Sequence, residues 1–185
     1  MPIASISPPN RAVALRVVRV AARTGVPTKG WLTAGMVRIP VALGRSGIRG
    51  DKREGDGATP RGRFHPLRVW WRADRGLRPR TFLPVRRIGP CDAWCEDAAD
   101  RRYNRPIRLT DGQAGDRLWR SDHLYDVMIE LDHNVRPRIA RRGSAIFIHV
   151  ARPGLRPTAG CVALPVTALR RLLRRLSRKT RIQIH

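Results

Sequence analysis

The stretch "IFIHVARPGLRPTAGCVALP", residues 146–165, places a histidine and a cysteine on either side of a loop rich in proline and glycine. His149 ends an apolar run, 144–150, that is typical of a strand buried on both faces. The loop that follows is long enough to return the chain beside this strand, and Gly160 permits a tight turn directly before Cys161. We therefore expect the histidine and the cysteine to lie near each other at the edge of a sheet.

Three interpretations of this pair are open on spacing alone. A nucleophilic cysteine needs a base within reach and donors for the developing oxyanion, and His149 with the backbone N–H groups at the Gly160–Cys161 turn could supply both. The same two residues could be ordinary core residues, because free cysteine is among the most buried residue types. Cys91 and Cys95 of "CDAWC" could also join them in a four-ligand zinc site, although a Cys-x₃-Cys spacing is less usual than Cys-x₂-Cys.

The rest of the chain predicts a mainly β domain with one clear helix, built as a single unit over 1–185. Strands are expected over 12–20, 35–44, 64–72, 106–109, 123–131, 144–150 and 180–185. The glycine-rich, charged segment 47–64 predicts a loop, and 73–122 is mostly irregular. An amphipathic helix with Pro165 in its first turn is predicted by leucines at i, i+3, i+4 and i+7, namely Leu169, Leu172, Leu173 and Leu176.

The chain is strongly basic, with a formal net charge of +24 from 38 basic and 14 acidic residues. Nearly all the basic residues are arginines, whose guanidinium groups bind carboxylates and phosphates through two parallel hydrogen bonds. A nucleic-acid-binding module is one alternative, but it would need a basic face with interleaved aromatic residues. Aromatic residues make up only 5% and the arginines are dispersed, so we expect no dedicated nucleic-acid partner.

The sequence also bears on the compartment and on the cysteines. No run of about 18 apolar residues exists, so we expect no transmembrane segment. The first 24 residues do not predict a signal peptide, because Arg16 and Arg19 interrupt the apolar stretch, and the sequence alone favours the cytoplasm. Three cysteines do not form a disulfide framework, and we expect no Cys91–Cys95 disulfide in a reducing compartment. We expect a monomer.

"IFIH" followed by "PTAGCVAL" resembles the signature of the L,D-transpeptidase family, the YkuD-type catalytic domain. That signature is a strand-borne histidine, a linker, and then Ser/Thr-His-Gly-Cys-apolar-Arg/Asn. The chain matches it at His149, Thr158, Gly160, Cys161 and Val162. "GDGATPRGRF", 55–64, is similar to the family's Thr-Pro-x-Gly segment, so the likeness covers roughly residues 30–175.

The chain departs from the family signature at two positions and in a shorter linker. Ala159 stands where the family usually has a second histidine, and Ala163 where it usually has arginine or asparagine. We expect the first departure to alter substrate positioning or pKa tuning more than the nucleophile itself. We expect another arginine, brought near in space, to replace the second.

The resemblance implies a mixed β-sandwich or barrel with one amphipathic helix in the C-terminal region, and a catalytic site without metal or cofactor. By matching position, Cys161 is the nucleophile and acyl carrier, and His149 is the base. The third member of the triad is the backbone carbonyl of Val150. The N–H groups of Gly160 and Cys161, with that of Ala159 as a third candidate, form the oxyanion hole.

The implied substrate is a peptidoglycan stem peptide or muropeptide, cleaved before its terminal D-Ala, with transfer of the acyl group to an amine. The alternative is hydrolysis by a cytoplasmic L,D-carboxypeptidase that trims tetrapeptides during peptidoglycan recycling. The absence of a signal peptide favours this second reaction, whereas the family resemblance favours the periplasm or cell envelope.

Residues 94–109 resemble an insertion in an arginine-rich bacterial subgroup of the family, and long loops in compact domains tend to be functional. We therefore expect its irregular part, 94–105, to form a lid or substrate wall, although a plain surface loop is the alternative. The expected substrate-binding residues are Thr158, Ala159, Arg152, Trp94, Arg102, Tyr103, Asn104 and His123. For His123, an ordinary surface or core position is the alternative to a place at the site.

Overall fold

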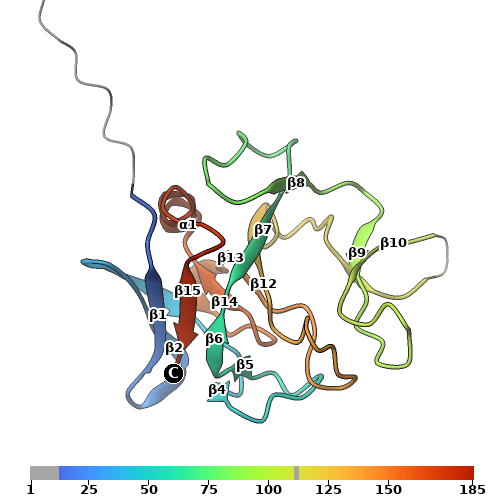
Figure 1. Ribbon diagram of the computed structural model, residues 1–185, viewed down its shortest axis with the longest axis horizontal. Coiled ribbons are helices and arrows are strands. Elements are labelled where there is room, and N and C mark those ends of the chain that lie inside the picture. The colour runs from blue at the N-terminus through green and yellow to red at the C-terminus, as the bar shows by residue number, and fades with distance from the viewer. Residues whose placement is uncertain (1–12, 111–112) are drawn as a thin grey trace, which may run out of the picture.

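The computed structural model describes residues 13–110 and 113–185, and these are built almost entirely from strands and turns (Figure 1). The elements are β1 (Val17–Arg23), β2 (Val26–Ala34), β3 (Val37–Ala42), β4 (Ile48–Arg49), β5 (Thr59–Pro60), β6 (Gly62–Phe64), β7 (Pro66–Trp71), β8 (Val85–Arg87), β9 (Asp92–Trp94), β10 (Pro106–Arg108), β11 (Asp116–Arg117), β12 (Val127–Leu131), β13 (Phe147–Val150), the 3₁₀ turn η1 (Pro153–Leu155), β14 (Val162–Leu164), α1 (Val166–Leu173) and β15 (Arg181–Ile184). Among the described residues, no helix is long and apolar enough to cross a membrane.

A ten-stranded mixed sheet dominates the molecule, in the order β6-β15-β1-β2-β3-β14-β13-β12-β7-β8. Only His65 separates β6 from β7, yet β6 pairs with β15 at one end of this order and β7 pairs with β12 near the other. The chain passing from β6 into β7 therefore joins the two ends, and the sheet curls on itself (Figure 1). The mainly β, barrel-like class expected from the sequence is confirmed.

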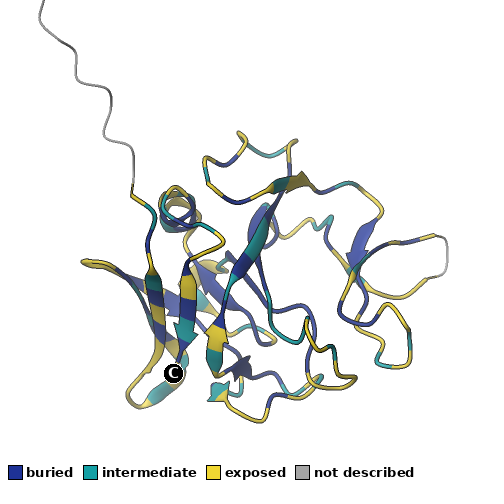
Figure 2. Ribbon diagram, viewed as in Figure 1, coloured by how far each residue is buried: buried dark blue, intermediate teal, exposed yellow. Residues whose placement is uncertain are grey.

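The inner face of the curled sheet holds the larger core. Because side chains alternate along a strand, Ile148 of β13 and Val162 and Leu164 of β14 point inward. The predicted amphipathic helix is confirmed as α1, and its leucines, together with Leu176 just beyond its end, join the same core. Pro165 occupies the N-cap position rather than the first turn. Burying one such leucine contributes about 1.5–3 kcal/mol to folding, and Figure 2 shows the buried interior that results.

A second, aromatic core lies on the outer face of β7, β12 and β13. Trp94 of β9 meets Phe147 of β13 edge to face, with ring centroids 5.0 Å apart, and Tyr125 meets the same ring at 5.9 Å. Trp70, Met128 and Leu118 belong to the same cluster, as does Cys161. The small sheet β10-β9-β11 is therefore packed against this face, beside the cysteine.

Several strand predictions need correction. The segment 35–44 is not one strand but the turn and second arm of a hairpin, whose first arm, β2, the sequence reading missed. Pro40 in β3 pairs with Trp31 on one side, while β14 pairs with β3 only at Ala42, so the proline sits where no second neighbour needs its N–H. The short strands β4, β5 and β6 lie in the expected loop 47–64, and β8, β9 and β11 in the irregular segment.

Three predicted strands begin later than expected. β12 starts at Val127 because 123–126 form a turn, closed by the Asp126 N–H donating to the His123 carbonyl at 3.2 Å. β13 starts at Phe147, after Ala145 takes a positive φ of 52°. β1 starts at Val17, and the first residue of the predicted strand, at 12, lies outside the described residues.

Candidate active site

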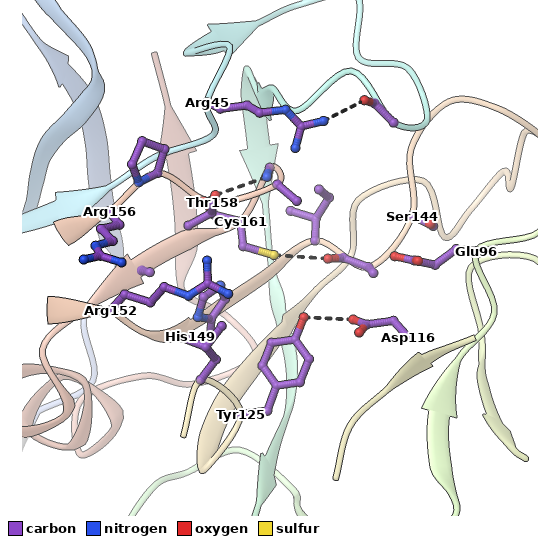
Figure 3. Close-up of a pocket in the computed structure, with 18 of the residues that line it drawn as sticks. Arg45, Glu96, Asp116, Tyr125, Ser144, His149, Arg152, Arg156, Thr158 and Cys161 are labelled. Atoms are coloured by element: carbon purple, nitrogen blue, oxygen red, sulfur yellow. Dashed lines mark hydrogen bonds between the residues drawn. The ribbon is translucent and has the colours of Figure 1, made fainter. Parts of the chain in front are cut away.

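A cavity of about 360 Å³ opens beside the ends of β13 and β14, and both Cys161 and His149 line it (Figure 3). β13 and β14 run parallel with His149 opposite Ala163. Cys161 lies two residues before Ala163, so the cysteine and the histidine project from the same face of neighbouring strands. The side chains that the sequence separates by eleven residues are thereby brought to one wall.

The thiol of Cys161 is held by two backbone groups. Its Sγ donates to the Ala145 carbonyl at 3.2 Å and accepts the Phe147 N–H at 3.3 Å, and the residue is only 8% exposed. Burial raises the pKa of Cys161 to about 12, against a smaller lowering by the Phe147 N–H. The resting group is therefore a thiol, and a thiolate forms only as its proton is taken away.

The imidazole of His149 is fixed by its own strand. Nδ1 lies 2.8 Å from the Val150 carbonyl, so Nδ1 carries the proton and Nε2 is left as an acceptor. Burial, with a smaller contribution from the positive charges of Arg120 and Arg152, lowers the pKa of His149 to about 4, although the hydrogen bond to the Val150 carbonyl acts in the opposite direction. The ring is thus neutral at pH 7, which is the state that a general base requires.

The turn before Cys161 depends on a close backbone approach. Gly160 has a φ of +148°, and a Cβ atom there would lie 2.9 Å from the Ala58 carbonyl. Thr158 Oγ1 accepts the Gly160 N–H at 3.1 Å and donates to the Cys161 carbonyl at 2.6 Å. Any oxyanion that binds the Gly160 N–H must therefore displace the Thr158 hydroxyl from it.

The "ATPRG" loop supports this turn from behind. Thr59 is fully buried; its hydroxyl accepts the Gly44 N–H at 2.8 Å and faces the Cys161 carbonyl at 3.5 Å. The segment that resembles the family's Thr-Pro-x-Gly motif is thus in contact with the backbone of the cysteine. Thr59 therefore helps to position the backbone of Cys161, because its hydroxyl contacts the carbonyl of that residue and not the thiol.

The cavity carries charges of both signs around Cys161. Arg152 and Arg156 lie on one side of Cys161, and Glu96 and Asp116 lie on the other (Figure 3). Arg120 is engaged by carboxylates, with Asp122 at 2.7 Å and Asp116 at 3.3 Å. The cavity can therefore present guanidinium groups to a carboxylate on one side and carboxylates to a cation on the other.

Both alanines that depart from the family signature line the cavity. Ala163 lies opposite His149 in the strand register, and its side chain is only a methyl group. The positive charge near His149 comes instead from Arg120 and Arg152. These arginines are supplied by the segment before β12 and the loop after β13.

Three of the eight expected substrate-binding residues, Arg152, Thr158 and Ala159, line this cavity. Trp94 and Asn104 do not: the indole N–H donates to the Asn104 amide oxygen at 3.0 Å, both residues are buried, and both border a different cavity of about 530 Å³. The structure therefore does not bring them to the cavity of Cys161, because they hold the small sheet against the aromatic core.

The other three expected contacts also lie away from the cavity wall. Tyr103 is buried and donates its hydroxyl to Glu54, which does line the cavity. Arg102 grips Asp100, with Nη2 2.6 Å from Oδ2. His123 is exposed and pairs with Asp126 at 2.7 Å. Arg102 and His123 are paired with acidic residues of their own loops, and Tyr103 is hydrogen-bonded to a residue of the cavity wall.

The sequence reading missed several residues of the cavity wall. Its charged and polar members are Arg45, Lys52, Glu54, Glu96, Asp116, Arg120, Tyr125, Ser144 and Arg156. The expected lid does contribute to the wall, through Glu96, but no pattern in its residues indicates which side chain lines the cavity. The length of the irregular segment 73–122 was the feature that indicated a functional loop, and Asp116 and Arg120 also come from this segment.

The other two cysteines do not join the pair. Cys95 packs with Ala93, Ile107 and Leu109 in a separate small cluster, and Cys91 is exposed. Within residues 13–110 and 113–185, no group of three or more His, Cys, Asp or Glu side chains is arranged to hold a metal ion. The zinc interpretation of these cysteines therefore finds no ligand set in the described chain.

A model of the YkuD family, described as the L,D-transpeptidase catalytic domain, matches residues 17–184. Among solved structures, the chain is similar to one described as the structure of Bdellovibrio bacteriovorus Bd1075, with 14% identity and a TM-score of 0.48. That alignment covers 96% of this chain and 50% of the other, so this chain spans half of its length. No curated protein matches the sequence.

Proposed function

The chain belongs to the YkuD family of L,D-transpeptidase catalytic domains, and from this premise we propose that it is a cysteine acyltransferase acting on peptidoglycan stem peptides. The observation that carries the proposal is the arrangement of Cys161 and His149 on one cavity wall, with Nδ1 of the imidazole held by the Val150 carbonyl. This leaves Nε2 free to accept a proton, as the base of a thiol–imidazole pair must.

The first step forms the acyl-enzyme. Nε2 of His149 takes the thiol proton as the sulfur attacks the carbonyl before the terminal D-Ala of a tetrapeptide stem. The imidazolium then gives this proton to the departing D-Ala nitrogen, which leaves a thioester on Cys161. Because both groups are neutral at rest, proton transfer accompanies the attack and does not precede it.

The donor peptide carries carboxylates, and the arginines of the cavity supply the matching charge. Arg152 and Arg156 lie beside the turn that bears Cys161, and Arg45 lines the same cavity. Guanidinium groups bind carboxylates through paired hydrogen bonds, so these residues would hold the stem peptide with its scissile bond at the thiol. In this role Arg152 would substitute for the arginine or asparagine that the family usually has at the position of Ala163.

The thioester can pass to an amine or to water. Transfer to an amine gives a cross-link or an exchanged D-amino acid, and belongs to the cell envelope. Hydrolysis makes the same site an L,D-carboxypeptidase, a reaction suited to tetrapeptides recovered in the cytoplasm. We propose transfer as the main reaction because carboxylates line the cavity wall opposite the arginines, where an ammonium group would be bound.

Intact-mass spectrometry of the protein with a tetrapeptide muropeptide tests the proposal. We expect a tripeptidyl adduct on Cys161 in the wild type, and its loss in Cys161→Ala and in His149→Ala. Cys91→Ala, which removes an exposed cysteine away from the cavity, serves as the matched control and should form the adduct normally. Release of D-Ala by Cys161→Ala at the wild-type rate would disprove the proposal.

A further inference from the structure

Asn104 ends its loop with a side-chain amide whose two polar atoms are both used inside the protein. The residue is buried, with only 4% of its surface exposed. Its Oδ1 accepts the Trp94 indole N–H at 3.0 Å and the Ala145 N–H at 3.2 Å. Its Nδ2 donates to the carbonyls of His133 and Asn134, at 3.1 and 2.9 Å. One amide therefore joins the small sheet, the loop after β12 and the segment that leads into β13.

The backbone of Asn104 fixes the direction in which this amide enters the interior. Its φ is 53°, a left-handed conformation that glycine adopts freely, that asparagine tolerates and that most other residues avoid. The Asn104 N–H donates to the Cys95 carbonyl at 2.8 Å, and the Cys95 N–H donates to the Arg105 carbonyl at 2.9 Å. The end of the small sheet therefore holds the asparagine from behind while its side chain points inward.

Ala145 connects the asparagine to the nucleophile. Its N–H donates to Asn104, and its carbonyl accepts the thiol of Cys161 at 3.2 Å (Figure 3). The φ of Ala145 is 52°, a conformation that a residue with a β-carbon keeps only when its surroundings hold it there. β13 begins only at Phe147, so pairing within the sheet does not fix the backbone of Ala145. The direction of its carbonyl therefore depends on the hydrogen bond to Asn104.

We propose that Asn104 is a positioning residue for Cys161 and acts through the backbone of Ala145. The inference rests on the proposed function, in which the sulfur of Cys161 is the nucleophile. Asn104 borders the second cavity and not the cavity of Cys161, so it acts without touching the substrate. A nucleophile that is already held in the direction of attack loses less freedom on the way to the transition state.

The Ala145 carbonyl also determines where the thiol proton lies before the reaction. In the resting protein the proton of Cys161 points to this carbonyl, and the Phe147 N–H donates to the sulfur from its other side at 3.3 Å. When the sulfur attacks, the proton leaves the carbonyl and passes to Nε2 of His149. A displaced Ala145 would allow the thiol to rotate away from the cavity wall, so fewer of its orientations would be productive.

The S–H stretching vibration of Cys161 tests this arrangement without substrate, because its frequency falls when the thiol donates a hydrogen bond. A Raman difference spectrum between a protein and its own Cys161→Ala variant isolates this vibration from those of the other cysteines. Asn104→Gly removes the amide, and glycine accepts the φ of 53° without strain. We expect the S–H frequency to rise in Asn104→Gly towards that of a free thiol. An unchanged frequency in the folded variant would overturn the proposal.

Trp94→Phe is the matched control, because it removes the other hydrogen bond to the same Oδ1 and leaves the bond to Ala145 in place. It should lower the Tm but keep the S–H frequency of Cys161 unchanged. Asn104→Asp retains an oxygen for the Ala145 N–H and should restore the frequency that Asn104→Gly loses. Equal changes of frequency in Trp94→Phe and Asn104→Gly would show that Asn104 supports the fold in general and does not position the thiol.

Turnover adds a kinetic test of the same role. With a tetrapeptide donor, Asn104→Gly should form the Cys161 adduct about tenfold or more slowly, while the KM for the donor stays nearly unchanged. Asn104→Asp should recover most of the rate, and Trp94→Phe should keep it. A wild-type rate in folded Asn104→Gly would contradict the positioning role.

Measurements on the wild type separate this inference from the proposed function and from the folding of any variant. In amide hydrogen exchange followed by NMR, the Ala145 N–H should exchange slowly although it lies outside the paired strands, whereas the exposed Gly154 should exchange fast. Exchange of Ala145 as fast as that of Gly154 would disprove the link to Asn104. If the wild type forms no adduct, the proposed function fails, while the exchange and the S–H frequency still decide whether Asn104 positions the thiol.

Discussion

The ring of Tyr125 meets the imidazole of His149 edge to face, with centroids 5.5 Å apart and an interplanar angle of 76°. The tyrosine is itself fixed, because its hydroxyl donates to Asp116 at 2.8 Å and the Arg120 guanidinium lies over its ring at 5.2 Å. The imidazole is therefore held from two directions, by the Val150 carbonyl at Nδ1 and by the tyrosine ring at its side. Such outer contacts set the direction of a catalytic group without touching the substrate.

Removal of this ring should impair turnover more than substrate binding. In Tyr125→Leu the imidazole loses one of its two supports, and we expect kcat to fall roughly tenfold to a hundredfold with little change in KM. Tyr125→Phe keeps the ring and loses the hydrogen bond to Asp116, so kcat should recover while stability falls by about 1 kcal/mol. Steady-state kinetics with a tetrapeptide donor and thermal unfolding give both quantities. A folded Tyr125→Leu protein with wild-type kcat would contradict the positioning role.

The three cysteines should differ sharply in their reaction with iodoacetamide. At pH 7.5 we expect Cys91 to be labelled first, because it is exposed, whereas burial raises the pKa of both Cys95 and Cys161. The labelling rate at Cys161 should still be rising above pH 9, with no plateau near neutral pH. Peptide mapping by mass spectrometry at several pH values measures this. A Cys161 rate that is already constant between pH 6 and 8 would indicate a stable thiolate–imidazolium pair instead.

His149 should make the fold sensitive to acid. Its folded pKa of about 4 lies below the ordinary histidine pKa of 6.5, so in this interval the unfolded chain binds a proton that the folded chain does not. The resulting loss of stability begins as the pH falls below 6.5 and is complete below 4. The difference corresponds to roughly 3 kcal/mol.

Denaturant unfolding between pH 7.5 and 4 measures this loss of stability, and His149→Gln is the comparison because glutamine does not titrate. We expect the wild type to lose more stability than His149→Gln over that range. Parallel losses in the two proteins would show that other groups cause the acid sensitivity.

The sequence predicted the parts of this molecule that depend on local pattern. The leucines from Leu169 to Leu176 predicted α1, and the apolar run ending at His149 predicted β13, because each pattern reports which face is buried. The hairpin arm β2 was missed because "VPTKGWLTA" mixes proline, lysine and glycine with few apolar residues. Its stability comes from pairing with β1 and β3 on either side, which is a property of the assembled sheet.

The same distinction between local pattern and assembled structure applies to the residues of the site. Cys161, His149 and the Gly160 turn were predictable because a strand, a loop and a glycine in that order bring them together. Glu96 could not be predicted, since it occupies an irregular segment in which charged residues are common and no periodicity indicates which of them faces inward. Trp94 was assigned to the substrate wall for its residue type, whereas its ring is needed in the aromatic core.

Gly160 offers the sharpest test of how the nucleophile is positioned. In Gly160→Ala the new Cβ would lie 2.9 Å from the Ala58 carbonyl, and the φ of +148° is one that residues with a side chain rarely adopt. The backbone conformation alone costs roughly 1–3 kcal/mol, and the contact with Ala58 adds to this. We expect a large loss of stability and, in any protein that folds, loss of adduct formation as the turn moves away from the "ATPRG" loop. Gly154→Ala is the matched control: its φ is +72° but nothing lies within 4 Å of its Cβ, so it should cost about 1 kcal/mol and leave the adduct unchanged. Equal effects of the two substitutions in denaturant unfolding would show that the contact with Ala58 does not constrain the turn.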